Sequence, residues 1–253
     1  MWFHKKNITI FLTIILPLSL SGCTTVNPAT GQRDFTPFMS PAKEMSIGKD
    51  AHPGILSDNG GVYRDERVNQ YVNDLGQKLV ANSELSDYPF TFTVLDTPLV
   101  NAFALPGGYV YVTRGILSMV NSESALASVI GHEIGHVTAR HSAKRYNNQM
   151  FTGLGAMILG AASGDSAVAN SLNQGAQAYL MSYSRNQEYQ SDELGIRYSS
   201  GAGYDPYASS DMLSSLDADH KLQLILANRA GEPEKSDFFS NLPRNNCQAA
   251  LWI

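Results

Sequence analysis

The sequence predicts a mainly helical α+β fold, in which a small antiparallel sheet lies beside a central helix. Three observations predict it. The 253 residues are 43% hydrophobic and 16% charged, which is enough apolar material for one sizeable core and too little charge for a disordered chain. Helical periodicity extends over most of the chain from residue 42 onward. Two short segments rich in aromatic and β-branched residues, 90–94 and 109–113, have the pattern of strands.

Residues 1–22 have the pattern of a secretory signal. A basic start at Lys5 and Lys6 precedes an apolar run over 8–20, which is too short to span a bilayer once its proline and polar residues are discounted. Residues 20–23, Leu-Ser-Gly-Cys, resemble a bacterial lipobox, in which the thiol is acylated and becomes the new N-terminus. We therefore expect Cys23 to be the lipid attachment site. The alternative is an uncleaved signal anchor with an incidental cysteine.

A lipid on Cys23 predicts a protein that works outside the cytoplasm. Each buried methylene of an acyl chain contributes about 0.8 kcal/mol to membrane binding. Thr24 follows the cysteine, and by resemblance to enterobacterial-type lipoproteins a residue other than Asp there predicts the outer membrane, with the domain facing the periplasm. Removal of Lys5 and Lys6 would take the net charge from −5 to −7. No basic stripe is visible, so we expect no nucleic-acid partner.

The segment 23–41 contains three prolines and one glycine, and it predicts a tether with an extended lead-in. We expect a single domain over residues 42–253, with a helix at 62–80 as its first strongly periodic element. A strand at 90–94 follows. Turn chemistry at 106–108 then separates an edge strand from a strand at 109–113.

A long helix is predicted over residues 122–145, because Ser122 is a capping residue, Glu123 opens the first turn and basic residues close the last one. Residues 150–180 are rich in Gly, Ala and Ser and predict a packed helical hairpin. No phosphate-loop lysine follows these glycines, and their apolar part is too short to span a bilayer. Further helices are predicted at 176–199 and 206–229.

The sequence His-Glu-Ile-Gly-His at 132–136 lies in the middle of this long helix. Four residues apart, the imidazoles of His132 and His136 differ by about 40° around the helix and can bind one metal ion. Glu133 lies beside the pair, where it can take a proton from a water that the metal activates. The pattern predicts a catalytic metal site. The alternative is a pair of core histidines with a salt-bridged glutamate.

A catalytic zinc ion needs a third protein ligand and an open position. A metzincin would need Gly at 139 and His at 142; the chain has Ala139 and Ser142, so that class is excluded. Glu188 and Asp192 lie four residues apart on a second predicted helix. We expect Glu188 to be the third ligand and Asp192 to orient a ligand imidazole. For Glu188 alone, a solvated helix face is the alternative.

Three motifs carry a specific resemblance: Asn-Ala-Phe-Ala-Leu-Pro-Gly-Gly at 101–108, Gly-His-Glu-Ile-Gly-His-Val at 131–137, and Ser-Arg-Asn-Gln-Glu at 184–188 with Ser-Asp at 191–192. In this order they resemble the BepA-type branch of the CAAX-protease-like zinc metallopeptidases, peptidase family M48. The likeness covers roughly residues 27–229.

That resemblance implies a zincin-like fold of the gluzincin class, with one Zn²⁺ held by His132, His136 and Glu188 and with Glu133 as the general base. It also implies that Asn101, on an edge strand along the cleft, contacts the backbone of a substrate that adds as a further strand. The alternative for Asn101 is a turn or strand-end asparagine.

The end of the chain departs from the family. After residue 240 relatives continue with a Thr-His-Pro element, where this chain reads Asn-Leu-Pro-Arg at 241–244. We expect a zinc-dependent endopeptidase at the periplasmic face of the outer membrane, acting on misfolded or unassembled envelope proteins. The alternative, motivated by this altered end, is a zinc-containing chaperone or assembly factor with little turnover. A structural zinc site is weaker, because such sites are usually closed and rich in cysteine.

Overall fold

The computed structural model describes residues 24–163 and 183–212, together with single positions between 214 and 225. The predicted signal at 1–22, Cys23, the second half of the predicted hairpin and the atypical end after residue 240 lie outside the described residues. Of the helix predicted at 206–229, residues 208–212 are helical and only single positions are described beyond them.

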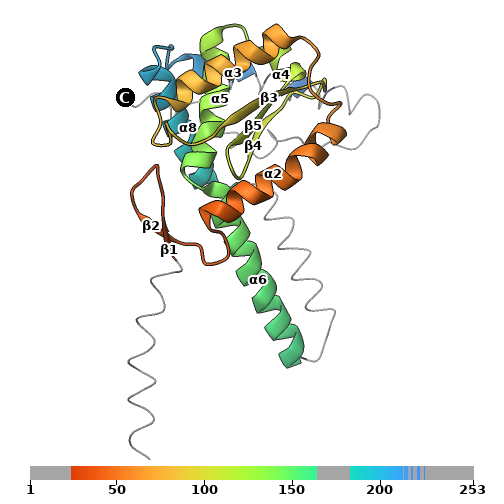
Figure 1. The fold of residues 1–253 in the computed structure, drawn as a ribbon, viewed down its shortest axis with the longest axis vertical. Coiled ribbons are helices and arrows are strands. Elements are labelled where there is room, and N and C mark those ends of the chain that lie inside the picture. The colour runs from red at the N-terminus through yellow and green to blue at the C-terminus, as the bar shows by residue number, and fades with distance from the viewer. Residues whose placement is uncertain are drawn as a thin grey trace, which may run out of the picture.

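The described residues form a mainly helical structure with two small sheets, which confirms the predicted α+β class (Figure 1). In chain order the elements are β1 (Thr24–Val26), β2 (Arg33–Phe35), α2 (Pro41–Asp58), α3 (Glu66–Val80), β3 (Thr91–Leu95), β4 (Ala102–Leu105), β5 (Tyr109–Thr113), α4 (Arg114–Met119), α5 (Glu123–Thr138), α6 (His141–Ser163) and α8 (Arg185–Gly201).

The main sheet has the strand order β3-β5-β4. Strand β4 pairs antiparallel with β5, so that Ala102 lies opposite Val112, whereas β3 pairs parallel with β5. The sheet is therefore mixed, although the sequence predicted an antiparallel one. The reason is that the chain passes from β3 to the far edge of the sheet, and the β4–β5 hairpin returns β5 into the gap between the other two strands.

The turn of this hairpin needs its two glycines. Gly107 and Gly108 have φ angles of +87° and +84°, which L side chains rarely adopt. A β-carbon on Gly107 would also lie 2.8 Å from the Cα atom of Met45 in α2. The turn predicted at 106–108 is thus present, and its glycine lets α2 lie close to the hairpin.

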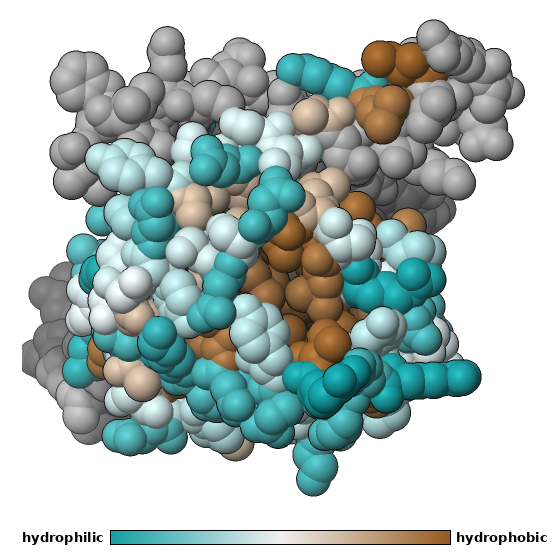
Figure 2. All heavy atoms as spheres, turned by 90° about the horizontal axis from the view of Figure 1, so that it is seen from above, coloured by the Kyte–Doolittle hydropathy of each residue, from teal (hydrophilic) through white to brown (hydrophobic). Residues whose placement is uncertain are grey.

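One apolar core joins the main sheet to α3, α5 and α8. Helix α3 packs on β3, and α5 packs on β4 and on α8. Seen from above, apolar side chains show in the middle of the face and hydrophilic ones surround them (Figure 2). Core residues include Val72, Leu75, Leu79, Val94, Val110, Val112, Ile116, Ile130, Ile134 and Leu194.

The prediction of one long helix at 122–145 is wrong, because two helices, α5 and α6, cover this range. Helix α5 ends at Thr138, Arg140 has a φ of 54°, and α6 begins at His141. The cause is tertiary, because the Arg140 guanidinium is buried and forms an ion pair of 2.9 Å with Glu44 of α2. A buried charge needs such a partner, and the left-handed residue turns the side chain toward it.

Residues 24–35, predicted as part of a tether, form the β1–β2 hairpin and pack at the junction of α5 and α6. The buried Asn27 side chain donates hydrogen bonds to Ala139 O and to Asp34 Oδ2, both at 2.9 Å. Lys144 forms an ion pair of 3.1 Å with Asp34. From this junction α6 extends away from the rest of the structure (Figure 1). Within the described part of the chain, no helix has the length and apolar character needed to cross a membrane.

Candidate active site

Helix α5 carries the histidine pair and Glu133 through the interior. Its N-cap is Ser122, whose Oγ accepts a hydrogen bond of 3.1 Å from Ala125 N. The cap sets the start of the helix, and the pair follows two and a half turns later. Glu133 is 2% exposed and His136 1% exposed, whereas His132 is partly exposed. The chemistry-bearing groups therefore lie at the edge of the core rather than on a solvated face.

Glycines let α8 approach α5 at backbone distance. A β-carbon on Gly131 would lie 2.9 Å from Gly195 O, and one on Gly195 would lie 2.7 Å from His132 N. A β-carbon on Gly135 would lie 3.0 Å from Ser191 O. Real β-carbons essentially never come as close to backbone atoms as the first two of these distances, and the third is tighter than most, so glycine at these positions allows the crossing. The crossing sets α8 directly beside the histidine pair.

Helix α8 begins so that its first turn faces this pair. Ser184 Oγ accepts a hydrogen bond from Gln187 N, and the Gln187 side chain accepts one from Ser184 N, which is a capping box. Glu188, in the first turn, is buried, and Asp192 follows one turn later. The carboxylates predicted to lie on one helix face both reach His132.

Three side chains converge on one point. The Nε2 atoms of His132 and His136 lie 3.0 Å apart. Glu188 Oε2 lies 3.3 Å from Nε2 of His132 and 3.8 Å from Nε2 of His136. The three potential ligand atoms lie within 4.8 Å of one another. Glu188 Oε2 is buried and has no hydrogen-bond partner in the described structure.

This donor set fits a zinc ion. Ligands about 2.0–2.1 Å from a tetrahedral zinc ion are about 3.3 Å apart, close to the separations found here. Two imidazoles and a carboxylate are also ligands that zinc takes in catalytic sites. A buried carboxylate oxygen without a partner is costly unless something occupies the point it faces. The residues present therefore fit the metal that the motif predicts.

Asp192 contacts the other nitrogen of His132. Its Oδ1 lies 2.8 Å from His132 Nδ1. Burial lowers the pKa of His132, but the nearby carboxylates of Asp192 and Glu188 outweigh it and raise the pKa well above its ordinary value. In contrast, burial and the neighbouring cations lower the pKa of His136 well below its ordinary value. The structure thus places Asp192 where the sequence predicted an orienting acceptor.

Glu133 points to the sheet edge. Its carboxylate accepts a hydrogen bond from the backbone N–H of Ala104 in β4. Burial raises the pKa of the Glu133 carboxyl to about 7, against the opposing effects of His132 and of this hydrogen bond. A carboxyl group with that pKa exchanges protons near neutral pH.

Asn101 lies immediately before β4. Its backbone N–H donates to Thr113 Oγ1 and its carbonyl accepts from Thr113 N, both at 3.1 Å. Its side-chain Oδ1 is buried and has no hydrogen-bond partner in the described structure. Asn101, which the sequence predicted to contact substrate, is thus held by its backbone hydrogen bonds, and its side-chain Oδ1 has no partner among the described residues.

Sequence reasoning gave no role to His141 and Tyr183, which contact His136, or to Gln190, which contacts His141. His141 Nδ1 lies 2.9 Å from His136 Nδ1, and Gln190 Oε1 lies 2.9 Å from His141 Nε2. The Tyr183 ring stacks on His136 with centroids 3.9 Å apart. Burial lowers the pKa of His141 to about 4. In one continuous helix, residues five apart differ by about 140°, so only the break at Arg140 brings His141 back to His136.

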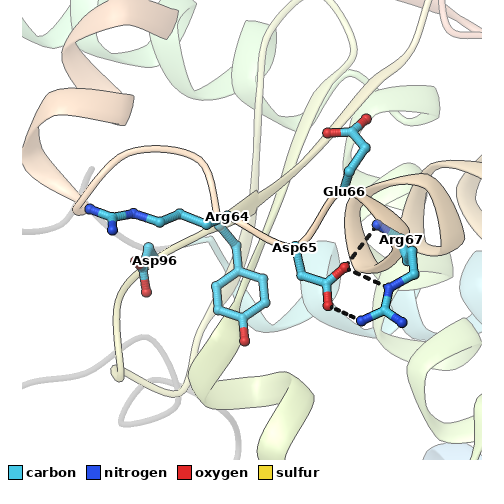
Figure 3. Close-up of a pocket in the computed structure, with 6 residues that line it drawn as sticks. Arg64, Asp65, Glu66, Arg67 and Asp96 are labelled. Carbon is cyan, nitrogen blue, oxygen red and sulfur yellow. Dashed lines mark hydrogen bonds and ion pairs between the residues drawn. The ribbon is translucent and has the colours of Figure 1, made fainter.

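The hollow drawn in Figure 3 is a separate surface feature. Its lining residues include none of the residues above. Asp65 and Arg67 face each other there in an ion pair of 2.8 Å, and Asp96 pairs with Arg114 at the same distance. The other lining residues are Tyr63, Arg64 and Glu66, and the lining contains no histidine.

The site defines a class of protein. Two histidines of a His-Glu-x-x-His helix and a carboxylate from a second helix are the metal-ligand set of a metallopeptidase, and the glutamate of the motif lies beside them. The chain belongs to peptidase family M48, which it matches over residues 66–245. The family resemblance found in the motifs is confirmed.

Named relatives include the beta-barrel assembly-enhancing protease of Escherichia coli (strain K12), 32% identical over 230 residues, which are 84% of this chain and 46% of that protein. The protein of the same name from Yersinia pestis is 33% identical over 183 residues, 69% of this chain and 37% of that protein. Mitochondrial metalloendopeptidase OMA1 of Schizosaccharomyces pombe is 31% identical over 179 residues, 69% of this chain and 52% of that protein. The chain spans about half of these relatives' length or less.

Proposed function

We propose that this protein is a zinc-dependent endopeptidase. The observation that carries the proposal is the convergence of His132, His136 and Glu188 on one point, with the Glu133 carboxylate on the same helix beside it. Membership of peptidase family M48 supports the same reaction class.

In this proposal His132, His136 and Glu188 hold the zinc ion, and Asp192 orients the His132 ring through Nδ1. When bound, the ion would polarise the scissile carbonyl and lower the pKa of a water molecule. Glu133 accepts a proton from that water while the water oxygen forms its bond to the carbonyl carbon. The same carboxyl then gives the proton to the amine nitrogen as the C–N bond breaks.

The open edge of β4 supports an extended substrate. Because Asn101 exchanges hydrogen bonds with Thr113, alternation along the ladder directs the backbone groups of Ala102 and Ala104 to the outer edge. Ala104 N–H is used by Glu133, which leaves backbone acceptors free for an added strand. Asn101 Oδ1, buried without a partner, is placed to accept from the substrate backbone. Only an unfolded or locally extended segment can add in this way.

We infer that the substrates are misfolded or unassembled proteins of the bacterial envelope. The printed name of the relatives, beta-barrel assembly-enhancing protease, supports this class. The lipobox-like sequence supports anchoring through acylated Cys23 at the periplasmic face of the outer membrane.

The test is cleavage of an unfolded β-barrel protein by the zinc-loaded chain, beside Glu133→Gln with equal zinc content. We expect peptide products from the wild-type protein and none from the variant, because the amide cannot accept the proton. Equal products from both would contradict the role of Glu133. No products from either, with zinc bound, would favour the chaperone or assembly factor.

A further inference from the structure

His141 and Gln190 lie outside the proposed ligand set, yet they extend a chain of contacts that begins at His136. His136 Nδ1 lies 2.9 Å from His141 Nδ1, and His141 Nε2 lies 2.9 Å from Gln190 Oε1. His141 is fully buried and His136 is 1% exposed, so water does not compete for the contact between the two rings.

The hydrogen bonds from His136 through His141 to Gln190 all run in one direction, from donor to acceptor. Gln190 Oε1 is a carbonyl oxygen that only accepts, so the hydrogen must be on His141 Nε2. A neutral imidazole has one N–H, which makes His141 Nδ1 an acceptor. His136 Nδ1 must then donate to it, and His136 Nε2 is left without a hydrogen.

That bare nitrogen is the one the metal site needs. His136 Nε2 lies 3.0 Å from His132 Nε2 and 3.8 Å from Glu188 Oε2, at the point where the three potential ligands meet. A metal ligand must offer a lone pair there. If the contacts ran in the opposite direction, the hydrogen would be on His136 Nε2 and would block it.

We propose that His141, oriented by Gln190, is a positioning residue that fixes the tautomer and ring direction of His136 for binding a divalent metal ion. The inference rests on the proposed metal site and adds to it. His132 and His136 would then each have an acceptor at Nδ1, Asp192 for the first and His141 for the second.

The two acceptors differ because their surroundings differ. The Asp192 side chain is 36% exposed, so its charge keeps contact with water. A carboxylate at position 141 would be fully buried, because His141 itself is fully buried. A neutral imidazole supplies the acceptor without another buried charge. Ser191 Oγ, 3.3 Å from His141 Nδ1, is the weaker neighbour.

The test compares three variants of the full chain. His141→Leu removes the acceptor and keeps an apolar group of similar size. His141→Gln restores an oxygen acceptor, and Ser191→Ala is the matched control that removes only the neighbouring hydroxyl. Zinc affinity is measured by competition with a chromophoric chelator, folding by circular dichroism, and the tautomer of His136 in the metal-free protein by ¹⁵N NMR of the imidazoles.

We expect His141→Leu to bind zinc about 10–100-fold more weakly, as is typical when a partner of a metal ligand is lost. His141→Gln should recover most of the affinity, and Ser191→Ala should bind like the wild type. In the wild-type protein the hydrogen should be on Nδ1 of His136, and in His141→Leu both tautomers should appear.

A folded His141→Leu with wild-type affinity would overturn the inference, as would a wild-type His136 with its hydrogen on Nε2. If His141→Leu does not fold, the wild-type spectrum and the affinity of Gln190→Leu decide instead. A wild-type protein that binds no zinc would contradict the proposed function, whereas the tautomer measurement would still test the hydrogen-bonded chain.

Discussion

Helices α6 and α8 both adjoin α5, and they use the same residue type differently. At the α5–α8 crossing, Gly131, Gly135 and Gly195 leave no space for a β-carbon. In α6, a β-carbon on Gly153 or Gly155 would meet nothing within 4 Å among the described residues. The α5–α8 crossing brings the proposed metal ligands together. Helix α6 contacts the core at its first residues and then extends away from it (Figure 1). A glycine in a helix therefore indicates function only through what lies opposite it.

The start of α6 depends on one buried ion pair, and breaking it should give the largest effect. Glu44→Ala leaves the Arg140 guanidinium buried without its carboxylate, because the arginine side chain is only 4% exposed. We expect a loss of about 3–5 kcal/mol in the free energy of unfolding. Urea denaturation measures it. Arg114→Ala, which breaks the partly exposed pair with Asp96, is the control and should cost about 1 kcal/mol or less. Similar losses in both would show that burial of the pair does not matter.

On the α8 side, Glu188→Ala should remove a metal ligand while leaving the fold in place. We expect zinc affinity to fall by more than about 100-fold, which exceeds the loss typical of an indirect partner. Chelator competition measures it. Unchanged affinity would mean that α8 supplies no ligand.

The glycine crossing can be tested without touching a ligand. Gly195→Ala places a methyl group 2.7 Å from His132 N, so the helices must separate and Glu188 must move. We expect a loss of about 1–3 kcal/mol in stability, as in overpacked cores, together with weaker zinc binding. Stability unchanged within error, with normal zinc binding, would disprove the close crossing.

We expect the smallest change in stability from a substitution of Gly153 in α6, which serves as the control for Gly195. In the part of the chain that the structure describes, the methyl group added by Gly153→Ala meets no atom within 4 Å, so we expect only helix propensity to act. We expect stability to stay the same or to rise by up to about 1 kcal/mol, with zinc affinity unchanged. Thermal unfolding measures this, and a clear loss would show that α6 packs more tightly at this position than the structure indicates.

The features that could be predicted from the sequence are those that depend on local residue spacing. The four-residue separations of His132 and His136 and of Glu188 and Asp192 place each pair on one helix face, and only the approach of the two helices was left to tertiary structure. The role of His141 could not be predicted in the same way. It depends on the left-handed Arg140, whose partner Glu44 lies 96 residues earlier in the chain.

The sheet also has features that local sequence predicts and features that only the tertiary structure determines. Strands β3 and β5 were predicted from their composition, but their parallel pairing follows from where the chain crosses between them, which composition does not record. The turn at Gly107 and Gly108 carried a local signal, and it was predicted.

X-ray absorption at the zinc edge of the loaded full chain would identify the ligands of the ion directly. We expect one zinc ion per chain with two imidazole nitrogens at about 2.0–2.1 Å and oxygen ligands completing the shell. A third imidazole, which would be His141 as a direct ligand, or a sulfur ligand would contradict both the ligand set and the positioning role of His141.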